Sequence, residues 1–179
     1  MKVPKENNIA FIDGQNLHLS TTANNWKVDY RKLRIYLRDK YHVMDAYYYF
    51  GYVSEEQQGL YSNLQRAGFI VVFKEHSSIL STKKKGNVDT DIVFEVMKNC
   101  IDNKDFNKIV LISGDGDYKK MVDYLIQKER FKKILFPSRK FRSSLYKKIT
   151  NSYFAYLDDE DIKEKIRRGG SLDKKKRVP

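Results

Sequence analysis

The sequence predicts a three-layer α/β/α domain built around a mainly parallel sheet. Apolar runs of strand length alternate with helix-like segments along most of the 179 residues. The strand-like runs are apolar at nearly every position, which is typical of strands covered by helices on both faces. With 41% hydrophobic residues, the chain is also long and apolar enough to bury a core.

Six strands are expected, and each is a short apolar run bounded by polar residues, glycine or a helix-like segment. The second is rich in tyrosine and phenylalanine, which favour strands, and the last is a short edge strand. In chain order the strands cover 8–13, 46–53, 69–73, 109–113, 133–136 and 153–157.

Helices are expected between and after these strands. Asp29 is the expected N-cap of the first helix, Ser54 begins a capping-box pattern before the second, and Gly68 ends that second helix. The later helices place apolar residues on one face at helical spacing. In chain order the helices cover 29–40, 54–67, 88–101, 118–128, 141–149 and 158–168.

The formal net charge is +12, and most of it lies in the C-terminal part of the chain. Residues 128–179 hold 17 basic and 7 acidic side chains. A basic half beside a neutral half indicates a polyanionic partner, most often nucleic acid, although solvated surface lysines would give the same composition. We interpret 1–168 as the domain and 169–179 (GGSLDKKKRVP) as a flexible basic tail that binds RNA nonspecifically.

Several other classes of protein are not indicated. A lone cysteine, Cys100, fits a reducing compartment and a cytoplasmic location. The N-terminus lacks the apolar core of a signal peptide, and no apolar run approaches the length of a membrane span, so no membrane partner is expected. Thiol and imidazole ligands are too scarce for a zinc site, and no glycine-rich phosphate-binding motif indicates a nucleotide cofactor.

Acidic side chains follow two of the expected strands. Asp13 ends the first strand, and Asp115 and Asp117 follow the fourth in the segment SGDGD. Ligands of an open parallel sheet bind beyond the carboxyl ends of its strands, at the point where the strand order reverses. We therefore expect these acids to converge in one crevice. The structural alternative is that each aspartate only caps the helix after it.

A third group of acids opens the helix expected at 88–101. Asp89 and Asp91 lie in its first turn, and Glu95 follows Asp91 on the same face. The helix dipole alone favours acids here. However, a basic loop lies just upstream, and together they suit a site for a metal ion and a phosphate. Massed carboxylates repel unless a cation joins them, and Mg²⁺ or Mn²⁺ can activate water for phosphodiester hydrolysis.

These residues resemble the NYN domain family, a branch of the PIN-like ribonuclease superfamily. FIDGQN looks like its first block, KGNVDTDIVFEVM its middle block and VLISGDGDYKKMVDYL its third, in the same order and at similar spacing. The likeness extends to about Leu157, and the overall appearance is that of small bacterial single-domain members. One departure is Glu95, since many relatives place an aspartate six residues after the middle acid.

The resemblance implies a Rossmann-like, PIN-like fold and cleavage of RNA that depends on Mg²⁺ or Mn²⁺. Asn16 is implied as a supporting polar neighbour of the acids. The implied catalytic residues are Asp13, Asn16, Asp89, Asp115 and Asp117, and the implied metal ligands are Asp13, Asp89, Asp91, Asp115 and Asp117.

Lysine and arginine supply most phosphate contacts in RNA-binding proteins. We expect RNA-binding residues on two rims of the site, although the structural alternative is again a solvated loop. They are Lys83, Lys84 and Lys85 on one rim and Arg139, Lys140 and Arg142 on the other.

The leading hypothesis is an endoribonuclease that prefers single-stranded RNA. Many compact nucleases of this type form pairs, so a homodimer is compatible with this hypothesis. One alternative is an RNA-binding or regulatory module of the same fold without catalysis, since some NYN proteins are thought to lack activity. The other is a structure-specific DNA nuclease that uses the same site.

Overall fold

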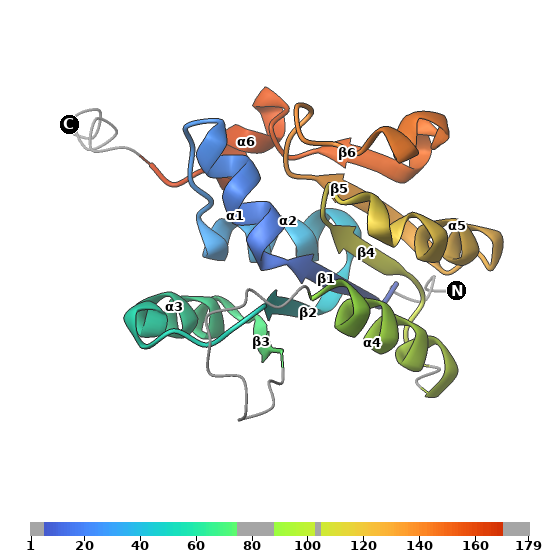
Figure 1. The fold of residues 1–179 in the computed structure, drawn as a ribbon, viewed down its shortest axis with the longest axis horizontal. Helices are drawn as coiled ribbons and strands as arrows, with labels where there is room; N and C mark the ends of the chain where they lie inside the picture. Colours follow the sequence, from blue (N-terminus) through green and yellow to red (C-terminus); the bar gives the residue numbers. More distant parts are fainter. Residues whose placement is uncertain (1–5, 75–87, 103–104, 170–179) are drawn as a thin grey trace, which may run out of the picture.

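The computed structural model describes residues 6–74, 88–102 and 105–169, in which six strands form one sheet. All strand pairs are parallel, and the order is β3-β2-β1-β4-β5-β6, seen in Figure 1 from β6 at the top to β3 at the bottom. This is the Rossmann order, so the predicted fold class is confirmed. The strands are β1 (Asn8–Asp13), β2 (Val43–Phe50), β3 (Ile70–Phe73), β4 (Ile109–Ile112), β5 (Phe131–Phe136) and β6 (Phe154–Tyr156).

Helices connect the strands and cover both faces of the sheet. Within the described ranges, none of them has the length and apolarity that crossing a membrane requires. The α-helices are α1 (Gly14–Ala23), α2 (Tyr30–Tyr41), α3 (Gln58–Ala67), α4 (Asp89–Asp102), α5 (Lys119–Gln127) and α6 (Glu160–Ile166). The short 3-10 helices are η1 (Glu55–Gln57), η2 (Gly116–Tyr118), η3 (Ser144–Lys148) and η4 (Asn151–Tyr153).

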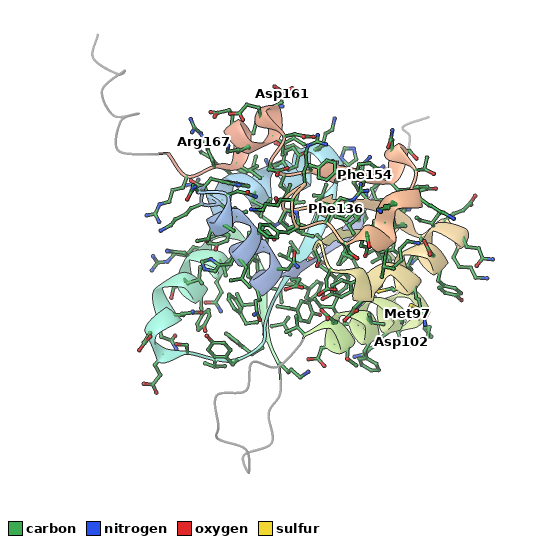
Figure 2. The ribbon with its side chains drawn as sticks, turned by 45° about the horizontal axis from the view of Figure 1, so that its top comes forward. Met97, Asp102, Phe136, Phe154, Asp161 and Arg167 are labelled. Atoms are coloured by element: carbon green, nitrogen blue, oxygen red, sulfur yellow. The ribbon has the colours of Figure 1, made fainter. Side chains whose placement is uncertain are left out.

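Alternate residues of the central strands pack into two cores, one on each side of the sheet. Phe11 of β1 packs in the core that contains α4 and α5, whereas Ile12 packs in the core that contains α1, α2, α3 and α6. Figure 2 shows the result, with Met97 of α4 and Arg167, the residue after α6, on opposite sides of the molecule. Because both faces are covered, β1 is buried along its whole length.

Two of the three local helix signals act where the sequence predicts, whereas Ser54 precedes η1 without a capping hydrogen bond from its side chain. Asp29 accepts a hydrogen bond from the backbone N–H of Lys32 (3.1 Å) and caps α2. Gly68 adopts a left-handed conformation, with φ of 91°, and ends α3. His42 ends α2 in the same conformation, so the chain enters β2 at once. Consequently β2 covers Val43–Phe50, three residues earlier than the predicted 46–53.

Two helical segments differ from the prediction. α1 is not among the predicted helices, because its sequence, GQNLHLSTTA, has no apolar stripe. Leu17 is its only large apolar side chain that is buried. The helix predicted at 141–149 is the 3-10 helix η3. Ser143 begins η3 by accepting a hydrogen bond from the backbone N–H of Leu145 (3.3 Å), and Tyr146 is held in the core.

Candidate metal centre

The strand order reverses between β1 and β4, which lie side by side at the centre of the sheet (Figure 1). Asp13 is the last residue of β1, and the segment SGDGD directly follows β4. α4 begins nearby with Asp89, which packs towards the sheet and is buried. The carboxyl edge of the sheet therefore carries acids from all three segments that the sequence singled out.

Three of these acids form a group that has the geometry of a cation site. One carboxylate oxygen from each of Asp89, Asp115 and Asp117 lies within 4.8 Å of the other two. Asp89 is buried, Asp115 is half-buried and Asp117 is exposed, so the group leads from the interior to the surface. We call these residues the three-carboxylate group. The described ranges hold no second group of this kind.

Asp13 is buried next to this group but is not one of its members. Burial raises the pKa of Asp13 to about 6, and the charges of Asp89 and Asp115 also raise it. Hydrogen bonds from Asn16 and Tyr118 act in the opposite direction. Its role as a metal ligand stays a prediction.

Two of the three aspartates at these strand ends, Asp13 and Asp115, also cap the turns after them. Asp13 Oδ1 accepts a hydrogen bond from the backbone N–H of Asn16 (2.9 Å), and Asp115 Oδ1 accepts one from the backbone N–H of Asp117 (3.1 Å). Each cap uses a single carboxylate oxygen. These aspartates therefore cap turns, as the structural alternative predicts, and also lie in or beside the cluster of acids.

Tyr118 supports Asp13 from the core, and sequence reasoning did not identify it as a site residue. Its buried hydroxyl donates to Asp13 Oδ2 (3.4 Å), as does the hydroxyl of Ser113 at the same distance. Burial and the charge of Asp13 raise the pKa of Tyr118, so this hydroxyl keeps its proton and stays a donor. The available signal was its position directly after SGDGD, where η2 turns the side chain inward.

Asn16 joins the first and third sequence motifs. Its side-chain Oδ1 accepts a hydrogen bond from the backbone N–H of Gly114 (2.8 Å), across 98 residues of sequence. Asn16 thus holds the β1–α1 turn against the loop that carries Asp115 and Asp117, a supporting role like the one that the family resemblance implies.

We expect Asn16→Ala to lower the free energy of unfolding by about 1–2 kcal/mol, because the buried N–H of Gly114 would lose its acceptor. Urea denaturation followed by circular dichroism measures this loss. The control is Asn99→Ala, which removes only a hydrogen bond to the Glu95 carbonyl within α4 (2.8 Å). Equal stability of Asn16→Ala and wild type would contradict the prediction.

Residues 143–146, in the segment after β5, form a wall against the acidic loop. The backbone N–H of Ser143 donates to the carbonyl of Gly114 (2.9 Å), and the Tyr146 hydroxyl donates to the carbonyl of Asp115 (2.9 Å). A Cβ atom at Gly116 would lie 2.5 Å from Ser143 Oγ, so the wall fits closely only against glycine. The loop is therefore held from both sides, by Asn16 and by this wall.

The other acids of α4 lie outside the three-carboxylate group. Asp91 Oδ2 is 3.8 Å from the Lys74 ammonium, and Glu95 pairs with Lys98 at the same distance. The prediction that Asp91 binds metal stays untested, and the structure places it beside a cation at the end of β3.

The predicted RNA-binding residues are divided between two regions. Lys83, Lys84 and Lys85 lie outside the described residues, as do residues 170–179 of the predicted tail. Arg139, Lys140 and Arg142 follow β5, next to the wall.

Two of these three cations contact side chains of β6 or of the turn after it. The Arg139 guanidinium pairs with Asp159 and lies 4.1 Å from the centre of the Tyr156 ring. Arg142 donates to the Tyr156 hydroxyl (2.6 Å) and lies near Phe136 and Phe154, both labelled in Figure 2. Lys140 is exposed, with its ammonium 5.4 Å from the centre of the Phe141 ring.

A doubly wound parallel sheet with acids gathered where its strand order reverses defines a three-layer α/β/α protein with a ligand site at the carboxyl edge of its sheet. The family model of the NYN domain matches residues 8–158, and the chain belongs to this family. It is similar to the low amplitude and bright protein LabA of Synechococcus elongatus, with 27% identity over 167 residues, which cover 88% of this chain and 86% of that protein.

The fold also matches a crystal structure of a protein of unknown function from Vibrio parahaemolyticus. The TM-score is 0.75 with 21% sequence identity, and the match covers 94% of this chain and 100% of the other. Similarity at this level of identity establishes the shared fold.

Proposed function

We propose that this chain is an endoribonuclease that uses Mg²⁺ or Mn²⁺ to hydrolyse phosphodiester bonds in single-stranded RNA. The observation that carries the proposal is the three-carboxylate group, with its oxygens within 4.8 Å of one another where the strand order of an NYN domain reverses. The net charge of +12 makes the rest of the chain attractive to a polyanion.

The residues present fit a hard divalent cation. Carboxylate oxygens are the ligands that Mg²⁺ and Mn²⁺ prefer, and three of them at this separation repel one another unless a cation joins them. Asp89, Asp115 and Asp117 would hold the ion. When bound, it would supply activation of a water molecule and relief of negative charge on the scissile phosphate.

The protein would position these groups before RNA arrives. Asn16 and Tyr146 fix the loop that carries Asp115, and Tyr118 holds the buried carboxylate of Asp13 in place. The exposure of Asp117 gives a substrate access to the group from solvent. Such preorganisation means that little of the site must rearrange during the reaction.

Cleavage of a fluorogenic RNA oligomer tests the proposal. We expect wild type to cut it with Mn²⁺ and not with excess EDTA, and we expect Asp115→Asn to lose at least about 100-fold in rate because it removes a charged ligand. The matched control is Asp161→Asn, an exposed aspartate in the first turn of α6, which should retain full activity.

The other outcomes identify the alternatives. Binding of RNA without cleavage by wild type would favour an RNA-binding or regulatory module. Cleavage of a matched DNA oligomer and not of RNA would favour a DNA nuclease. A covalently closed circular RNA, which an exonuclease cannot cut, tests the endonucleolytic part of the proposal.

A further inference from the structure

We infer that Phe141 and Leu145 form a ledge beside the metal centre on which one nucleobase of single-stranded RNA stacks. This inference rests on the proposed function, because it names the part of the substrate that the same site would recognise. We call these two side chains the stacking ledge.

Both ledge residues expose apolar surface next to a polar site. Phe141 is 42% exposed and Leu145 is 59% exposed, and both belong to the segment between β5 and β6. Single exposed apolar side chains are ordinary on protein surfaces, so exposure alone does not indicate function. Their position relative to the acids is the informative observation.

The ledge residues contact the acidic loop on both sides of Asp115. The carbonyl oxygen of Phe141 lies 2.9 Å from the place that a Cβ atom on Gly114 would occupy. Leu145 Cδ1 lies 2.8 Å from the corresponding place on Gly116. The backbone of Phe141 therefore lies against the residue before Asp115, and the side chain of Leu145 lies against the residue after it.

This segment is fixed relative to the carboxylates. The hydrogen bonds from Ser143 to the Gly114 carbonyl and from Tyr146 to the Asp115 carbonyl join it directly to the acidic loop. Ser143 also accepts a hydrogen bond from the backbone N–H of Leu145. A base placed on the ledge would therefore hold its own phosphate at a defined position near the three-carboxylate group.

The surrounding charge suits a nucleotide. The Lys140 ammonium lies 5.4 Å from the centre of the Phe141 ring, and Lys147 and Lys148 follow on the exposed side of η3. An aromatic ring beside cations is the usual platform for unpaired bases, because the ring stacks the base while the cations neutralise the backbone. Base faces in a duplex are already stacked, so the ledge selects single-stranded or looped RNA.

Binding measured without cleavage tests the ledge separately from the proposed activity. We expect Phe141→Ala to weaken binding of a fluorescein-labelled single-stranded RNA 12-mer about tenfold in EDTA, whereas Phe141→Tyr should stay within about twofold of wild type. The control is Phe94→Ala on α4, where the side chain is 61% exposed and lies outside the wall, and its affinity should be unchanged.

A second variant reports stacking directly. Trp26 is the only tryptophan and is 7% exposed, so Phe141→Trp adds the one exposed indole. We expect its fluorescence to be quenched by single-stranded RNA and not by a duplex of the same sequence.

The ledge would be overturned if wild type did not bind single-stranded RNA, or if Phe141→Ala bound it with unchanged affinity. It would also be overturned if Phe141→Ala changed the oligomeric state seen by sedimentation and left RNA binding unchanged, because the ledge would then be a protein interface. The proposed activity can fail while the ledge stands, if RNA binds in EDTA as expected and is never cut with Mn²⁺. Conversely, metal-dependent cleavage with unchanged affinity of Phe141→Ala overturns only the ledge.

Discussion

At pH 7.5 in metal-free buffer, we expect Asp13→Asn to be more stable than wild type by about 3 kcal/mol, from the 1.36 kcal/mol that each pKa unit represents. The pKa of Asp13 is raised from 3.8 to about 6 by burial and then by the neighbouring carboxylates. Folded wild type must therefore keep an unfavourable buried charge at neutral pH. Asparagine removes that charge and can still cap α1, because its side-chain oxygen can accept from Asn16. Its amide nitrogen would face the hydroxyls of Ser113 and Tyr118, which can turn to accept from it.

The sign of the pH dependence follows from the raised pKa. The proton on Asp13 stabilises the folded state fully below about pH 3.8, and this contribution is lost as the pH rises through about 6. The stability difference between the variant and wild type should therefore grow from pH 4 to about pH 6.5 and then level off. Urea denaturation at a series of pH values measures it.

The matched control is Asp29→Asn, which changes the same residue type at the N-cap of α2, where the three-carboxylate group is absent. We expect this control to have only a small effect on stability at pH 7.5. Adding Mn²⁺ should stabilise wild type more than Asp13→Asn and so reduce or reverse the difference in stability between them. A variant less stable than wild type at pH 7.5 without metal would contradict the assignment of a strained buried charge.

Gly14→Ala should destabilise the protein by about 3 kcal/mol or prevent folding altogether, as overpacking of a rigid site does. The new Cβ atom would lie 2.6 Å from the backbone carbonyl oxygen of Tyr49, and the ring of Tyr48 lies closer still. Tyr48 is 1% exposed and packed in the core, so neither neighbour can move away cheaply. The absent side chain at this position lets the β1–α1 turn lie directly on β2.

Gly59→Ala in α3 is the matched control, since nothing lies within 4 Å of its added Cβ atom. This exchange should raise the free energy of unfolding by up to about 1 kcal/mol through the better helix propensity of alanine. Thermal melting of the two variants compares them. Similar melting temperatures for Gly14→Ala and wild type would contradict the prediction and would show that β2 can move to accommodate the added Cβ atom.

Much of the fold could be predicted because the controlling signals are local. The uninterrupted apolar runs predict strands covered on both faces, and Asp29 and Gly68 mark helix ends with their own side chains or conformations. The acids after β1 and β4 predict a shared crevice, because parallel strands present their carboxyl ends at one edge. Asp89, Asp115 and Asp117 do lie together there.

The remaining features depend on contacts between distant segments. α1 has little periodicity of its own and is held by the Asp13 cap and by Leu17 in the core. Tyr118 supports Asp13 only because β1 and β4 are neighbours in the sheet. Likewise, Arg139 and Arg142 contact Tyr156 because β6 adds to β5, a pairing that no local pattern specifies.

The hydrogen bond between Asn16 and Gly114 has a consequence during protein synthesis. It joins segments made far apart in time, and two of the three clustered carboxylates are translated after residue 114. An incomplete chain that ends before β4 therefore holds Asp13 and Asn16 without their partners. If the chain has the proposed function, its capacity to cut RNA would arise late, after Asp115 and Asp117 have been made, and the ribosome that makes it would not meet a half-built nuclease.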